Sequence, residues 1–288
     1  MTPLRKKMID LMTFKKYSPK TQRSYLFAVT ELSKSFHCSP EHIAEQAIKE
    51  WLIQTANERH WSESTIYMVT SGLKFIYRRV LERPDFFADM PLPKRAQKIP
   101  DLLTQQEVCA ILNETTNLKH MTLLSLCYGC GLRVSEVVAL TQDRIDSGHH
   151  LVLIRQAKGR KDRQVPLSDS LLYQLRVYWQ QYRPKNYLFC SNRPGKRLST
   201  SSAQKVFNRA KQAAGISKVG GIHSLRHAYA THQLEQGLPI HQLQRILGHQ
   251  NINTTLRYLH WIPHRDSLAV DLVAQLPLVT RYRLFNRG

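Results

Sequence analysis

A proline-rich segment constrains the fold of this chain more than any other feature of the sequence. Residues 83–100 read RPDFFADMPLPKRAQKIP, with four prolines and no helical period. Proline lacks a backbone N–H and disfavours helix in the residue before it, so this segment is predicted to be an extended, basic connection. We therefore expect two domains, at residues 1–87 and 102–277, joined by a linker at 88–101 and followed by a basic tail at 278–288.

The first domain has the pattern of a helical domain. Apolar residues recur with a helical period over residues 21–36, 39–59 and 62–81, and strand-like alternation is absent. Ser or Thr precedes each of these segments, with Pro or an acidic residue in the first turn, as helix starts favour. A small all-helical domain is therefore predicted.

The second domain adds a small amount of β structure. Helices are predicted over residues 104–113, 119–130 and 134–140, and short strands over LVLI at 151–154 and RQVPL at 163–167. The strands flank the basic turn AKGRKD, and the rest is mostly helical apart from a short YLFC run near Tyr187. The expected fold class is mainly α with a small β-sheet.

The charge of the chain favours a nucleic acid partner. Its 288 residues include 42 Lys and Arg against 21 Asp and Glu, a formal net charge of +21 at pH 7. Because 42% of the residues are hydrophobic, the composition is that of a globular protein and the charge lies on a folded surface. Such an excess repels itself unless a polyanion neutralises it. A nucleic acid partner is thus favoured over an acidic small molecule.

A secreted cationic protein is the competing interpretation of this charge. The five cysteines are odd in number and lie mostly in apolar helical segments, which favours reduced thiols over a disulfide framework. The first residues lack the apolar stretch of a signal peptide, and no window approaches the length of a membrane helix. We expect a soluble, cytoplasmic protein that does not enter membranes.

Two candidate residues lie in the segments before and between the strands. Arg133, in GCGLRVSE, follows a glycine-tight turn where a phosphate could approach, although an ion pair with Glu136 is the simpler interpretation. Lys158, in AKGRKD, lies at the tip of the expected hairpin and could reach a groove beside the sheet. A solvated basic turn or a DNA backbone contact is the alternative for Lys158.

Four more candidates lie near the C-terminal end of the second domain. In HSLRHAYATH, His223 and Arg226 are three residues apart and so share one helix face, although a single histidine is more often a satisfied core residue. In LGHQNINTTLRY, a helix stops at Gly248 before His249, and Tyr258 lies on a new helix. On one unbroken helix the last two would point in opposite directions, so the break allows them to converge. Taken alone, Tyr258 could equally be a packing residue.

Taken together, the six candidates have the order and C-terminal spacing of a known family. The segments GLRVSE, AKGRKDR, HSLRHAYATH and LGHQNINTTLRY resemble the signatures of the tyrosine recombinase (phage integrase) family. The resemblance covers about residues 21–277 and implies a helical SAM-like DNA-binding domain followed by the family's catalytic domain. The two-domain form is similar to Xer-type and transposon-borne enzymes.

The resemblance implies a site-specific DNA recombinase that works through a covalent 3′-phosphotyrosine. Tyr258 would attack the scissile phosphate, while Arg133 and Arg226 would stabilise the negative charge of the transition state. Lys158 would protonate the leaving 5′-oxygen, His223 would handle the phenolic proton, and His249 would hydrogen-bond the phosphoryl oxygens.

No metal, ATP or other cofactor is expected. The cationic side chains could supply the charge stabilisation that nucleases obtain from metal ions. Cys127 and Cys130 form a C-x-x-C pair, but without a second pair they are expected to be core residues rather than zinc ligands.

Two kinds of partner are expected. The first is duplex DNA that contains recombination sites, which the two domains would hold as a clamp, and the second is further copies of the chain. Leu268, Leu272 and Leu276 form an apolar stripe, extended by Val273, that must be buried somewhere. The resemblance implies that this C-terminal helix packs on a neighbouring protomer in a tetramer on DNA, and docking on its own domain is the alternative.

Two other functions remain open at this point. A type IB topoisomerase would share the tyrosine chemistry, and the segment LEQGLPIHQLQRILGHQNINTTLRYL could form the helix-turn-helix of a non-enzymatic regulator. The small N-terminal domain favours the recombinase, and the regulator would leave the Arg133, Lys158 and Tyr258 constellation unexplained.

Overall fold

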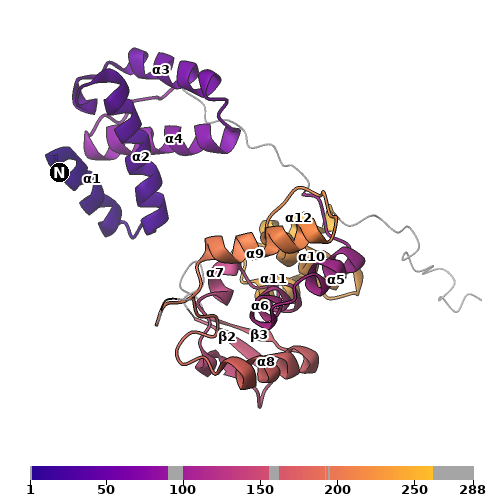
Figure 1. Cartoon of the computed structure of the whole chain (residues 1–288). Helices are drawn as coiled ribbons and strands as arrows, with labels where there is room; N and C mark the ends of the chain where they lie inside the picture. Colours follow the sequence, from indigo (N-terminus) through magenta and orange to yellow (C-terminus); the bar gives the residue numbers. More distant parts are fainter. Residues whose placement is uncertain (1, 90–99, 156–161, 192, 194, 262–288) are drawn as a thin grey trace, which may run out of the picture. The chain divides into compact units, whose positions relative to one another are not determined.

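The computed structural model describes residues 2–89, 100–155, 162–191, 193 and 195–261 (Figure 1). The chain divides into two compact units, residues 1–98 and 99–288. Among the described residues, no helix is long and apolar enough to cross a membrane.

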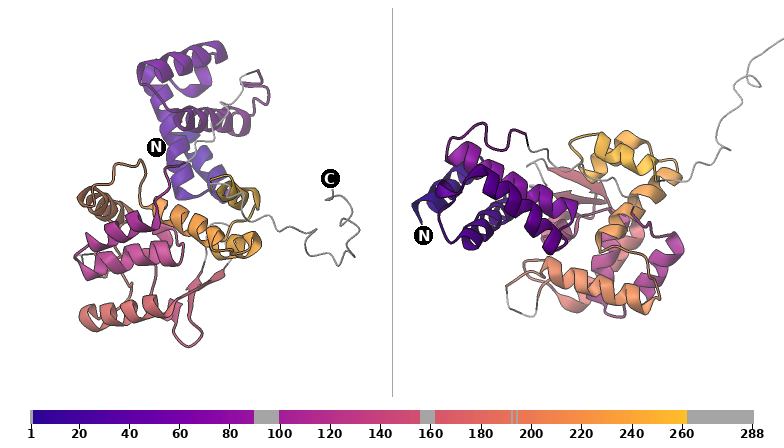
Figure 2. Two further views of the ribbon diagram at one scale, coloured as in Figure 1. Left: turned by 90° about the vertical axis from the view of Figure 1, so that its right-hand side faces the viewer. Right: turned by 90° about the horizontal axis from the view of Figure 1, so that it is seen from above.

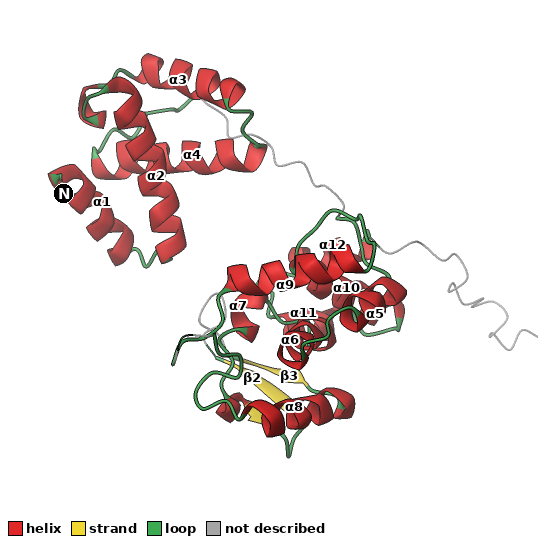
Figure 3. Cartoon of the chain, in the orientation of Figure 1, coloured by secondary structure: helices red, strands yellow, loops and turns green. Residues whose placement is uncertain are grey.

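The first unit is entirely helical in its described part, as predicted (Figure 3). The long helix α2 packs against α4. Figure 2 shows the two units from two further sides. The elements are α1 (Pro3–Phe14), α2 (Pro19–Phe36), the short 3-10 helix η1 (Pro40–His42), α3 (Glu45–Glu58), α4 (Glu63–Phe75) and the π-helix η2 (Ile76–Val80).

Three details of this unit differ from the sequence prediction. The sequence analysis assigned no element to α1, whose N-cap is Thr2 and whose first residue is Pro3. The predicted helix over 39–59 is interrupted at Ile43, which has an extended backbone. The predicted helix over 62–81 changes from α to π geometry at Ile76.

The residues after the π-helix fold back onto the first unit. Phe86 and Phe87 are both buried in its core. Arg78 Nε donates a hydrogen bond to the Phe86 carbonyl at 2.7 Å, and the Phe87 N–H donates to Glu45 Oε1 at 2.9 Å. This part of the proline-rich segment is therefore packed rather than extended, while residues 90–99 lie outside the described residues.

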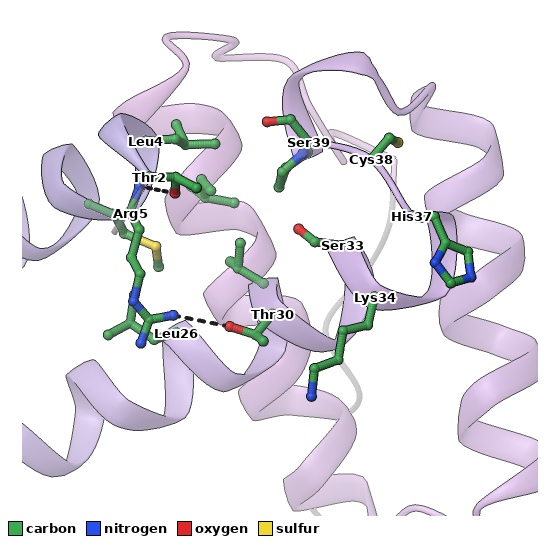
Figure 4. Close-up of a pocket in the computed structure, with 14 residues that line it drawn as sticks. Thr2, Leu4, Arg5, Leu26, Thr30, Ser33, Lys34, His37, Cys38 and Ser39 are labelled. Carbon is green, nitrogen blue, oxygen red and sulfur yellow. Dashed lines mark hydrogen bonds between the residues drawn. The ribbon is translucent and has the colours of Figure 1, made fainter.

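A cavity of about 670 Å³ opens between α1, α2 and the segment that follows α2 (Figure 4). Its lining includes the apolar side chains of Met8 and Ile76 and the basic side chains of Arg5 and Lys34. Arg5 Nη1 donates a hydrogen bond to Thr30 Oγ1 at 3.2 Å. None of the five candidate residues that the structure describes lines it.

The second unit is mainly α with a small sheet, which confirms the predicted fold class (Figure 3). Helix α7 is shorter than the predicted 134–140, and β1 was not predicted. The elements are α5 (Gln105–Asn113), α6 (Leu118–Gly129), α7 (Val134–Val137), η3 (Gln142–Arg144), β1 (Ile145–Asp146), β2 (Leu151–Ile154), β3 (Arg163–Pro166), α8 (Asp169–Tyr182), α9 (Thr200–Ala213), α10 (His223–Glu235), α11 (Ile240–Leu247) and α12 (Asn253–Leu259).

The sheet is antiparallel, with the strand order β1-β2-β3. The two predicted strands, β2 and β3, are present and pair as a hairpin, with Ile154 opposite Arg163. Helix α11 packs against β3, so the start of that strand lies close to the last helices of the unit. The hairpin tip at 156–161 lies outside the described residues.

Helix α6 forms the centre of the second core, in contact with α8, α9 and α10. Cys127 and Cys130 are both buried there, as the sequence predicted. Burial raises the pKa of the Cys130 thiol to about 12, so this thiol is protonated at neutral pH.

Candidate active site

Five of the six candidate residues lie in the described part of the second unit. Arg133 directly precedes α7, His223 and Arg226 lie on α10, His249 follows α11, and Tyr258 lies on α12. The structure brings four of them, Arg133, Arg226, His249 and Tyr258, into one cluster through hydrogen bonds, ring stacking and ion pairs with Glu136. His223 is the exception, and Lys158 lies outside the described residues.

Arg133 follows a turn that requires glycine. Gly131 has φ +57°, and a Cβ atom there would lie 2.4 Å from Tyr229 Cδ1. Beyond this turn, the Arg133 backbone N–H and its Nη1 donate to the two carboxylate oxygens of Glu136 at 2.8 and 2.9 Å. The ion pair considered as the simpler interpretation is therefore present, and a fifth of the Arg133 side chain stays exposed to a ligand.

Glu136 is also bound by a second arginine, Arg163, which was not among the six candidates. Arg163 Nη1 and Nη2 donate to its two oxygens at 2.9 and 2.7 Å, and both side chains are buried. Burial alone would raise the pKa of Glu136, but the hydrogen bonds and charges of Arg163 and Arg133 outweigh it and lower the pKa to about 2. Glu136 is therefore a charged anchor for arginines.

Arg226 is a buried cation that joins two chain segments. Its side chain is 4% exposed, Nη1 donates to the Gly131 carbonyl at 2.6 Å, and Nη2 donates to the Leu247 carbonyl at 2.7 Å. Nη1 also lies 3.9 Å from Glu136 Oε2. Burial, reinforced by the charge of Arg133, lowers the pKa of Arg226 to about 10, so the guanidinium keeps its charge at neutral pH.

His249 is held by hydrogen bonds at both ring nitrogens. It follows Gly248, which ends α11 with φ +64°. Nε2 lies 3.2 Å from Arg226 Nη2, and Nδ1 lies 2.9 Å from Thr255 Oγ1. Because arginine can only donate, Nε2 accepts and Nδ1 carries the proton. Burial and the nearby arginines lower the pKa of His249 to about 4, so the ring is neutral.

Tyr258 is buried beside these groups. Its side chain lies on α12, and its ring stacks on that of His249 with centroids 6.2 Å apart and an interplanar angle of 11°. The break after Gly248 thus brings the two rings together. Burial raises the pKa of Tyr258, against the lowering effect of Arg226 and Arg133. The phenol is therefore protonated in the protein alone.

The hydroxyl of Tyr258 contacts a residue that the sequence analysis did not select. His227 Nδ1 lies 3.2 Å from the Tyr258 hydroxyl oxygen. His223, which was selected, lies at the start of α10, where part of its side chain is exposed. Burial of the remaining part, together with the charges of Arg226 and Arg133, lowers its pKa. The four-residue spacing from His223 places His227 on the same helix face, and this spacing was the signal that could have identified it.

Each of the two units matches a known protein family. The phage integrase family matches residues 101–264, and the N-terminal SAM-like domain of phage integrases matches residues 4–85. A putative integrase/recombinase, y4qK, from Sinorhizobium fredii is 38% identical over 260 residues, which cover 90% of this chain and 84% of that protein. The tyrosine recombinase XerA from Pyrococcus horikoshii is 29% identical over 253 residues, which cover 86% and 87%.

Solved structures share the fold. The crystal structure of XerA recombinase matches 96% of this chain and 100% of its own, with a TM-score of 0.54 and 24% identity. The Tn1549 transposon integrase in complex with circular intermediate DNA matches 96% and 98%, with a TM-score of 0.69 and 19% identity. A lambda integrase tetramer bound to a Holliday junction matches 88% and 76%, with a TM-score of 0.73 and 17% identity.

Proposed function

Because the chain belongs to the phage integrase family and is a tyrosine-type site-specific DNA recombinase, we propose that Tyr258 is its nucleophile. In the proposed reaction the phenolic oxygen attacks the scissile phosphate and forms a 3′-phosphotyrosine, and a 5′-hydroxyl leaves. The covalent bond keeps the energy of the phosphodiester for rejoining, so that no ATP is consumed.

The observation that supports this proposal is the position of Tyr258 beside a buried cation. Arg226 touches His249, and His249 stacks on Tyr258, so the phenol and the guanidinium belong to one cluster. A phosphate that reached this phenol would meet Arg226 and Arg133, whose guanidinium groups match phosphoryl oxygens. The negative charge that builds up in the transition state would be stabilised without a metal ion.

The other candidate roles remain proposals of the same kind. Lys158 would protonate the leaving 5′-oxygen, and His249 would donate to a phosphoryl oxygen. In the protein alone, His249 Nε2 accepts from Arg226, so its phosphoryl contact requires a proton on that nitrogen and a new partner for Arg226. Binding of a phosphate would favour this change because it adds negative charge beside the ring.

The test of the nucleophile uses a duplex nicked close to the cleavage site, which traps the covalent intermediate. Tyr258→Phe removes one oxygen and should eliminate covalent adducts while leaving DNA affinity in gel-shift titrations nearly unchanged. The matched control is Tyr229→Phe, a buried tyrosine of the same unit, which should still form adducts. Adducts that persist in Tyr258→Phe would place the nucleophile elsewhere.

The helices that suggested a helix-turn-helix contribute to this cluster instead. Helix α11 supplies the Leu247 carbonyl that binds Arg226, and α12 supplies Tyr258. A regulator that only binds DNA has no need for a phenol beside a buried guanidinium. The recombinase and a topoisomerase differ in products, and recombinant junctions formed from two sites would exclude simple relaxation.

We further propose that four copies assemble on two recombination sites of a mobile element in the cytoplasm. The apolar stripe of Leu268, Leu272 and Leu276, outside the described residues, would pack on a neighbouring protomer. Truncation before Asp266 should then leave binding to one site largely intact and abolish cooperative pairing of two sites in gel-shift titrations. A truncated protein that pairs sites as well as the full chain would favour docking of the stripe on its own domain.

A further inference from the structure

We propose that His227 is the group that accepts the proton of the Tyr258 hydroxyl during DNA cleavage and returns it during rejoining. This inference rests on the proposed role of Tyr258 as nucleophile. It assigns to His227 the step that the family resemblance assigns to His223.

The first argument is the fixed geometry of the two side chains. His227 Nδ1 lies 3.2 Å from the Tyr258 hydroxyl oxygen, which is hydrogen-bond distance for proton transfer. Trp261 packs edge-on against both rings, with centroids 5.5 Å from His227 and 5.0 Å from Tyr258. The three rings therefore restrict one another, and the contact does not depend on a freely rotating side chain.

The second argument concerns the direction of this hydrogen bond. Arg226 is the cation that contributes most to lowering the pKa of the Tyr258 hydroxyl, and a guanidinium attracts the oxygen of a hydroxyl rather than its proton. This charge favours the arrangement in which the phenolic oxygen faces Arg226 and its single proton points to His227 Nδ1. The imidazole must then carry its own proton on Nε2 and present an unprotonated Nδ1.

The protonation state of His227 agrees with this direction. Burial, followed by the positive charges of His223 and Arg226, lowers the pKa of His227 to about 4. The ring is therefore neutral at physiological pH and free to accept a proton. When a DNA phosphate enters, its negative charge opposes the effect of the arginine and makes His227 a stronger base.

His223 is less suited to the same step. It is exposed and lies one helical turn before His227, at the first residue of α10. Among the described hydrogen bonds, the ring nitrogen that the Tyr258 hydroxyl contacts is Nδ1 of His227.

The proposed step balances. As the phenolic oxygen forms its bond to phosphorus, the O–H bond breaks and its proton moves to His227 Nδ1, leaving an imidazolium. The bond from phosphorus to the 5′-oxygen breaks, and that oxygen takes a proton from a separate acid, for which Lys158 is proposed. In rejoining, the 5′-hydroxyl attacks, the acid recovers its proton, and the imidazolium protonates the departing phenolate.

The test measures single-turnover adduct formation on nicked duplex DNA by the full chain. His227→Gln and His227→Ala should slow adduct formation by about 10²-fold or more, with DNA affinity and melting temperature close to wild type. His232→Gln is the matched control, because it removes a largely buried histidine and its hydrogen bond to Tyr128 from the same helix. The control should cleave at nearly the wild-type rate.

Two further readouts separate proton transfer from packing. Without its base, His227→Ala should form adducts at a rate that rises about tenfold per pH unit, whereas the wild-type rate should be nearly flat at neutral pH. The groups that face His227 are His223 and Arg226 on α10, His249 after α11 and Tyr258 on α12. A fluorinated tyrosine at position 258, with a more acidic phenol, should restore much of the rate of His227→Ala.

Each outcome decides the proposal. If His227→Gln cleaves like wild type, or if neither pH nor the fluorinated tyrosine changes the rate of His227→Ala, His227 only packs against Tyr258 and the inference is wrong. Peptide mapping of the wild-type adduct separates the two proposals. An adduct away from residue 258 would overturn the proposed function, and this inference with it, whereas a Tyr258 adduct with unaffected His227 variants overturns this inference alone.

Discussion

Arg163 and Glu136 form a two-fold hydrogen-bonded ion pair in the interior of the second unit, with distances of 2.9 and 2.7 Å. Arg163 Nε also donates to the Ile246 carbonyl at the end of α11, so the pair connects β3, α7 and α11. Arg133 binds the same carboxylate, and Arg226 lies 3.9 Å from it. One buried negative charge therefore holds the arginines on which the proposed chemistry depends.

Glu136→Gln should destabilise the second unit by about 3–5 kcal/mol at pH 7, because it leaves buried guanidinium groups without a counter-charge. The folded pKa of Glu136 is about 2, below the ordinary 4.5, so its charge contributes stability above pH 4.5. That contribution is lost as the pH falls from 4.5 towards 2. Thermal denaturation should therefore give a lower melting temperature for Glu136→Gln than for wild type at pH 7, and the difference between the two melting temperatures should become smaller as the pH falls below 4.5.

Asp169→Asn is the control for this experiment. Asp169 pairs with His150 at 3.0 Å, but its side chain is 92% exposed. Exposed pairs contribute about 1 kcal/mol or less, so the control should melt close to wild type. Equal melting temperatures for Glu136→Gln and wild type would refute the anchoring role of Glu136.

Gly131→Ala should destabilise the protein by about 1–3 kcal/mol and slow adduct formation. The new Cβ would meet Tyr229 at 2.4 Å in a turn with φ +57°, and the Gly131 carbonyl is a partner of Arg226. Gly215→Ala is a matched control, because Gly215 has φ +69° but no atom within 4 Å of the added Cβ. If both variants lose the same stability, backbone strain alone explains the effect.

The stability of the second unit should fall as the pH is lowered from 6.5 to 4. His249 keeps a folded pKa of about 4 against an ordinary 6.5, so the unfolded chain binds a proton in this range that the folded chain refuses. His249→Gln should reduce the slope of the free energy of unfolding against pH by at most about 1.4 kcal/mol per pH unit. Chemical denaturation at pH 7.5 and 5 measures the difference, and parallel curves for the two proteins would contradict it.

DNA cleavage should survive an excess of EDTA. The proposed charge stabilisation comes from Arg133 and Arg226, and the described residues contain no cluster of three or more His, Cys, Asp or Glu side chains suited to a metal ion. Adduct formation on nicked DNA should proceed at the same rate before and after chelation. Loss of cleavage in EDTA and recovery in magnesium would show that a metal supplies part of the charge.

Local signals in the sequence predicted several helices and some of their ends. Ser18 and Ser62 cap α2 and α4, and Thr104 caps α5 through a reciprocal interaction with Glu107. Such caps depend on residues three positions apart, which a sequence shows directly. Helix α1 was not predicted, although Leu4, Met8, Leu11 and Met12 recur there at helical spacing and pack in the first core. The local signal was therefore present in the sequence and was missed.

The sequence by itself determined the two-domain, mainly helical fold and the family, because these depend on periodicity, caps and the spacing of a few side chains. The partners of those side chains were decided only by tertiary structure. Arg163 reaches Glu136 across 27 positions, His227 reaches Tyr258 across 31, and Arg226 reaches the Gly131 carbonyl across 95. A hydrogen bond forms only when its donor and acceptor lie a few ångströms apart, and the pKa of a buried group depends on neighbours at similar distances. Which polar groups become neighbours is decided by the packing of α6, α10, α11 and α12.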